Sequence, residues 1–83
     1  MPEVFNLFGY SFYFYSKEHE PIHIHVEGEE GLVIYDLIDG EFILRKEKGK
    51  VKASSKKKIV KALKEHKNLI VEVWKEHFGE DAE

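Results

Sequence analysis

The stretch that decides the fold is Ile22-His23-Ile24-His25-Val26-Glu27, in which apolar and polar side chains alternate without a break. Successive side chains of a β-strand point to opposite faces, so this alternation predicts a strand with one apolar and one polar face. The three apolar residues are expected to face the core. The two histidines and the glutamate are expected to face the other way.

Turn residues and further apolar segments surround this strand. Gly9 and the Asp39-Gly40 pair are typical turn signals, and Gly28-Glu29-Glu30-Gly31 turns the chain between them. Connections this short allow only antiparallel neighbours. We therefore predict an antiparallel β-meander of four to five strands, within about residues 3–45. The expected strands cover residues 4–8, 10–15, 22–27, 32–37 and 41–44.

The second half of the sequence predicts one long helix over about residues 55–78. Its apolar side chains recur at steps of three and four, which is the helical period. Ser54 or Ser55 is a suitable N-cap, Gly79 ends the pattern, and residues 45–53 read as a connector. The expected fold is a single α+β domain of residues 1–83, with the sheet packed against one long C-terminal helix.

Length and composition bound the function. The chain has 83 residues, of which 42% are hydrophobic, and this suffices for one small core. It has no cysteine, which excludes disulfides and thiolate zinc sites and fits a cytoplasmic protein. We expect no signal peptide, and no apolar run approaches the ~20 residues of a membrane helix. Domains this small are marginal alone, so a homodimer or a protein partner is expected.

Charge is strongly segregated along the chain. Residues 1–44 carry a net charge of −8, residues 45–67 carry +9, and residues 68–83 carry −4. Such asymmetry suggests that the basic segment steers an anionic partner. The alternative is that a lysine-rich helix surface is simply solvated.

The histidines of the alternating stretch are the first candidate for chemistry. His23 and His25 project from one face at a spacing of about 6–7 Å. Glu27 extends their row, and His19 precedes it in a polar loop. Imidazoles and a carboxylate suit a divalent transition metal such as zinc, so these four residues form a candidate ligand set. The alternative is that they are the ordinary polar face of a strand.

Acid–base chemistry is a second use of the same histidines. Two nearby imidazoles, one neutral and one protonated, suit proton transfer to and from an RNA ribose and its leaving oxygen. His23 and His25 are then the candidate catalytic pair. Lys56, Lys57 and Lys61 are the candidate groups that hold the phosphates.

Tyrosines and an aspartate accompany the histidines. Tyr13 and Tyr15 are expected to flank the two histidines if their strands pair, and they would suit contact with a protein or with bases. The alternative is that they are ordinary strand formers. Asp36 lies in a later strand. It is expected either to accept a hydrogen bond from an imidazole or to be a polar-face residue.

These residues resemble a known family. The segments Phe8 to Ser16 and Glu18-His19-Glu20-Pro21-Ile22-His23-Ile24-His25-Val26 are similar to the defining stretch of the small bacterial family catalogued as domain of unknown function 4160. That stretch reads Glu-His-x-Pro-Pro-His-(Val/Ile)-His-Val, so Ile22 replaces its second proline. The resemblance extends to a closing helix with Trp74 near its end. It implies a one-domain prokaryotic protein that belongs to a two-gene, toxin–antitoxin-like operon.

Three functional hypotheses follow. The first is a regulatory protein that binds a small protein partner encoded nearby, through the sheet face or the exposed helix surface. The second is a ribonuclease-like toxin that uses His23 and His25. The third is a metal-binding protein ligated by His19, His23 and His25. The first agrees best with the small size and the segregated charge, and whether the chain is an enzyme stays open.

Overall fold

The structure is a computed structural model that describes residues 3–14 and 22–78. The sheet contains β1 (Glu3–Leu7), β2 (Tyr10–Tyr13), β3 (His23–Gly28), β4 (Gly31–Ile38) and β5 (Glu41–Gly49). Two helices follow, α1 (Ala53–Glu65) and α2 (Lys67–Phe78). Neither helix has the length and apolar character that crossing a membrane requires.

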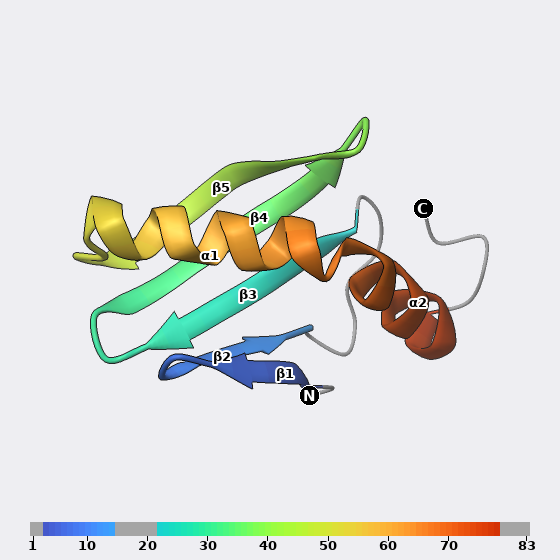
Figure 1. Cartoon of the computed structure of the whole chain (residues 1–83), viewed down its shortest axis with the longest axis horizontal. Helices are drawn as coiled ribbons and strands as arrows, with labels where there is room; N and C mark the ends of the chain where they lie inside the picture. Colours follow the sequence, from blue (N-terminus) through green and yellow to red (C-terminus); the bar gives the residue numbers. More distant parts are fainter. Residues whose placement is uncertain (1–2, 15–21, 79–83) are drawn as a thin grey trace.

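The five strands form one antiparallel sheet in the order β1-β2-β3-β4-β5, which confirms the predicted meander (Figure 1). β3 lies at its centre. The register pairs Tyr13 of β2 with His25 of β3, and His23 of β3 with Asp36 of β4. The histidine row therefore lies between two other strands and not at an edge.

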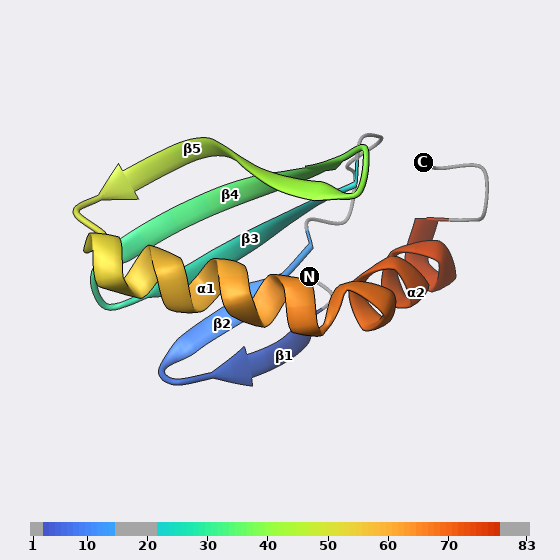
Figure 2. The same cartoon turned by 45° about the horizontal axis from the view of Figure 1, so that its top comes forward.

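The core lies between one face of the sheet and α1, which crosses that face (Figure 2). The fully buried side chains of this core are Phe12, Phe14, Ile24, Val26, Val33, Ile59, Leu63, Ile70 and Trp74. Ile24 and Val26 face α1, so the alternation of β3 places the two histidines on the opposite face. The predicted separation of apolar and polar faces is confirmed for this strand.

The C-terminal region is two helices and not the single long helix that we predicted. The break is at His66, whose backbone has φ −110° and ψ 22°. Its amide donates to the carbonyl oxygen of Ala62 at 3.0 Å, and its Nδ1 lies 2.9 Å from the same oxygen. Its ring packs on Phe5 of β1 with centroids 4.7 Å apart. The change of direction places α2 beyond the end of the sheet, where Ile70 and Trp74 become fully buried (Figure 1).

The expected connector over residues 45–53 is also wrong, because β5 continues to Gly49. The extra length pairs with β4 up to Gly31. These two glycines approach each other closely. A Cβ on Gly49, whose φ is +84°, would lie 2.6 Å from the carbonyl oxygen of Glu30. Lysine-rich sequence is compatible with a strand here because β5 is an edge strand that water reaches.

Two glutamates hold the segment that leads into α1. The helix begins at Ala53, and Lys52 at the N-cap makes no side-chain capping bond, so the expected serine cap is wrong. Instead, Glu47 Oε2 accepts from the Val51 amide at 3.1 Å, and Glu30 Oε1 accepts from the Lys52 amide at 3.3 Å. Two carboxylates beside a helix N-terminus also favour its positive dipole end.

Candidate functional site

The two histidines of β3 are buried. His23 and His25 each expose 3% of their surface, and their ring centroids are 5.7 Å apart. Tyr13 stacks on His25 with a centroid separation of 5.2 Å, and the indole of Trp74 lies 5.6 Å from His23. Both histidines therefore lie on the polar face of β3 but are not exposed to solvent. In this conformation neither imidazole is accessible to a phosphodiester.

The candidate metal ligands are only partly placed. His19 and Tyr15 lie outside the described residues. Glu27 accepts a hydrogen bond from the hydroxyl of Tyr13 at 2.9 Å. Within residues 3–14 and 22–78, no group of three histidine, aspartate or glutamate side chains has an arrangement that could hold a metal ion. A zinc site on this row would therefore need a ligand from elsewhere in the chain.

Asp36 contacts an arginine and not an imidazole. Arg45 Nε donates to Asp36 Oδ2 at 3.1 Å, and Arg45 Nη2 lies 2.8 Å from Oδ1 in a geometry unsuited to a hydrogen bond. The β4–β5 register shifts between Ile34 and Tyr35, which leaves Arg45 as the extra residue of a bulge. Bulges redirect side chains in this way. Sequence reasoning missed the arginine because the bulge leaves no pattern in a basic segment.

The lysines named as phosphate ligands are not near the histidines. Lys56, Lys57 and Lys61 lie on α1, which covers the sheet face opposite to His23 and His25 (Figure 2). The sheet separates the two groups. The described arrangement therefore does not bring the lysines and the histidine pair to one phosphate.

The three lysines instead belong to an elongated surface hollow, which we call the lysine groove. Its first part, about 510 Å³, is lined by Ala53, Lys56, Lys57, Val60, Lys61 and Lys64. Its second part, about 450 Å³, is lined by Gly40, Glu41, Phe42, Val60, Lys64 and Lys67. The two parts share Val60 and Lys64 and run from α1 to the β4–β5 turn. Lys64 and Lys67 were missed, although helical spacing from Lys57 and Lys61 would have found them.

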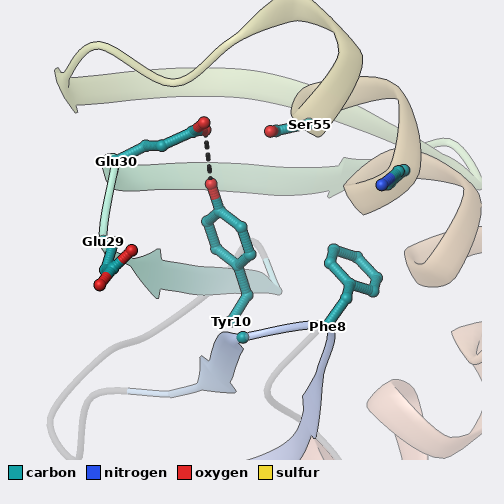
Figure 3. Close-up of a pocket in the computed structure, with 7 residues that line it drawn as sticks. Phe8, Tyr10, Glu29, Glu30 and Ser55 are labelled. Atoms are coloured by element: carbon teal, nitrogen blue, oxygen red, sulfur yellow. Dashed lines mark hydrogen bonds between the residues drawn. The ribbon is translucent and has the colours of Figure 1, made fainter.

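A second pocket lies beside the first turns of α1, on another side of the helix from the lysine groove (Figure 3). It has a volume of about 480 Å³ and is lined by Phe8, Gly9, Tyr10, Glu29, Glu30, Ser55 and Lys58. The Tyr10 hydroxyl donates to Glu30 Oε1 at 2.8 Å (Figure 3). This bond lowers the pKa of Glu30, with further help from Ser55 and Lys52. Burial, and then Glu30, raises the pKa of Tyr10. The Tyr10–Glu30 hydrogen bond and the bond from the Lys52 amide to Glu30 therefore link β2 to the start of α1.

A comparable carboxylate lies beneath the other side of the helix start. Lys56 Nζ donates to Glu47 Oε1 at 2.6 Å. This bond, followed by the one from the Val51 amide, lowers the pKa of Glu47. Burial, and then the charge of Glu47, raises the pKa of Tyr35. The pair leaves Lys56 partly neutralised, whereas no described carboxylate forms an ion pair with Lys57, Lys61 or Lys64.

Comparison with known proteins identifies a family. No curated protein and no solved structure matches the chain significantly. One protein family does match, over residues 9–75, a range that contains β2 to β5, α1 and most of α2. Because this match covers more than half of the 83 residues, the protein belongs to the family described as Domain of unknown function (DUF4160).

Proposed function

We propose that this protein is a regulatory binding component of a toxin–antitoxin-like pair, and that a small protein partner adds a strand to its open edge at β5. The observation that carries the proposal is the exposed apolar half of β5. Ile43 and Leu44 expose 47% and 41% of their surface, although they lie in a strand. An edge strand offers unpaired backbone N–H and C=O groups to an added strand, and exposed apolar side chains on it offer further contact.

The rest of β5 has the features that prevent unwanted pairing. Arg45 forms the bulge, and Lys46 and Lys48 are exposed. Lysines and bulges are common protections of edge strands. The bulge and the lysines lie within residues 45–48, so residues 42–44 are the part of β5 that can pair with a partner strand. A partner strand would therefore combine apolar residues opposite Leu44 with acidic residues opposite the basic half.

The operon that the family resemblance implies supplies the partner to test. The product of the neighbouring gene is co-expressed with this protein, and the affinity of the purified pair is measured by calorimetry. Leu44→Glu is expected to weaken binding at least tenfold, a change of about 1.4 kcal/mol. Leu69→Glu is the matched control because Leu69 is 40% exposed on α2, away from β5.

Equal affinities for the two variants would refute binding at β5. Absence of any complex would refute the regulatory pair. Sedimentation of the isolated protein tests the remaining case, in which the protein pairs with itself. A dimer that Leu44→Glu dissociates would identify a second copy of this chain, and not the neighbouring gene product, as the occupant of the edge.

A further inference from the structure

We propose that the lysine groove is a docking site for an acidic amphipathic helix of the partner protein. The inference rests on the proposed function in one respect, which is that the occupant is a protein. The groove adjoins β5, since Glu41 and Phe42 of that strand line its second part. A partner held at the β5 edge would therefore be next to it.

The dimensions of the groove suit a short helix. Its first part follows α1 from Ala53 to Lys64, a rise of about 16 Å at 1.5 Å per residue. A partner helix of about three turns covers that length. Residues three and four positions apart lie on one side of α1, so Lys57, Lys61 and Lys64 form one row along the groove.

The lining of the groove is complementary to a ligand that has both apolar side chains and carboxylates. Val60 and Phe42 are half-buried side chains that provide an apolar floor. Lys57, Lys61 and Lys64 are exposed at its sides, and no described carboxylate neutralises them. Lysine stems add apolar surface and keep their ammonium groups in water. An apolar side chain flanked by carboxylates complements this combination.

Nucleic acid is the competing polyanion, and the structure favours protein over it. The lining of the groove contains no arginine, the residue with the bidentate geometry for phosphate. Among the described residues of the lining, Phe42 is the only aromatic one, and it is partly buried against the core, so it offers little surface for base stacking. Glu41 at one end, and the net charges of −8 and −4 in the flanking sequence, would repel a long polyanion that continued past the groove.

The test uses the full chain and fluorescein-labelled 12-residue probes, with binding followed by fluorescence anisotropy. The main probe is a peptide with leucines at helical spacing and glutamates elsewhere. The comparison probes are the same peptide with serine in place of leucine, and a 12-nucleotide uridine RNA. We expect the main probe to bind, and both comparison probes to bind at least tenfold more weakly.

Two double charge reversals separate the groove from general electrostatics. Lys57→Glu with Lys61→Glu reverses two charges in the groove and is expected to weaken the binding of the main probe at least tenfold. Lys50→Glu with Lys75→Glu makes the same change of charge at two exposed positions that do not line the groove, and the affinity for the main probe is expected to stay within twofold. Circular dichroism establishes that both variants are folded. Equal losses in the two variants would overturn the proposal.

The remaining outcomes distinguish this inference from the proposed function. Tighter binding of the RNA or of the serine peptide would overturn the inference, since the groove would then recognise only negative charge. A groove variant that keeps full affinity for the neighbouring gene product would also overturn it and leave strand addition at β5 intact. If that product never binds but the leucine peptide does, the proposed pair fails and the docking site stands.

Discussion

The attachment of α2 to the end of the sheet gives a quantitative prediction, through the substitution Ile70→Ala. Ile70 has no exposed surface, and it lies in the same helix as Trp74, the single tryptophan of the chain. The substitution removes three carbons, worth about 2.4 kcal/mol at about 0.8 kcal/mol each, and a cavity adds to this. We therefore expect a loss of about 3–4 kcal/mol in the free energy of unfolding.

The neighbouring Leu69→Ala is the matched control. It removes the same number of carbons from a side chain that is 40% exposed, so no closed cavity forms, and we expect a loss of about 1 kcal/mol or less. Urea unfolding followed by tryptophan fluorescence and by circular dichroism measures both values. If the two variants lose stability to within about 0.5 kcal/mol of each other, the burial of this helix face and the reasoning built on it are wrong.

Two further predictions concern the contacts around the start of α1. Gly49→Ala is expected to cost about 1–3 kcal/mol by urea unfolding, because it combines a φ of +84° with a collision at Glu30. Gly9→Ala has the same φ but no atom within 4 Å, so a loss as large as that of Gly49→Ala would contradict the argument. Tyr10→Phe removes the bond that most lowers the pKa of Glu30. A lowered folded-state pKa stabilises the protein above the ordinary glutamate value, about 4.3, and this stability is lost as pH falls through the folded value. The difference in unfolding free energy between wild type and Tyr10→Phe should therefore decrease as pH falls from 7 to 3, and an undiminished difference would contradict it.

The buried histidine row has a consequence for the catalytic hypothesis. Each imidazole is enclosed by aromatic neighbours, and the sheet separates both from the lysines of α1. A reaction at His23 and His25 would first require the displacement of Tyr13 or Trp74. Binding through the exposed surfaces of β5 and α1 requires no such change, which is why we favour it.

The positions of the strands could be predicted from the sequence because the side chains of a strand alternate between two faces, and this alternation is visible in adjacent residues. The alternation from Ile22 to Glu27 predicted a strand and its apolar face. Tyr13 was expected to flank the histidines if the two strands paired, and it pairs with His25. The glycine and Asp39-Gly40 turns predicted the meander. The histidine motif indicated the family that the chain belongs to.

Tertiary contacts decided the features that have no local pattern. The continuation of β5 through basic residues depends on hydrogen bonds to β4, and the helix break at His66 depends on packing against Phe5 and the sheet end. The segment that leads into α1 is held by Glu47 and by Glu30, and Glu30 is 22 residues away from the Lys52 amide that it binds. Sequence alone thus determined the order of strands and the α+β class. Only the folded chain decided which polar residues are buried and where its lysines gather, because both depend on neighbours that sequence spacing does not specify.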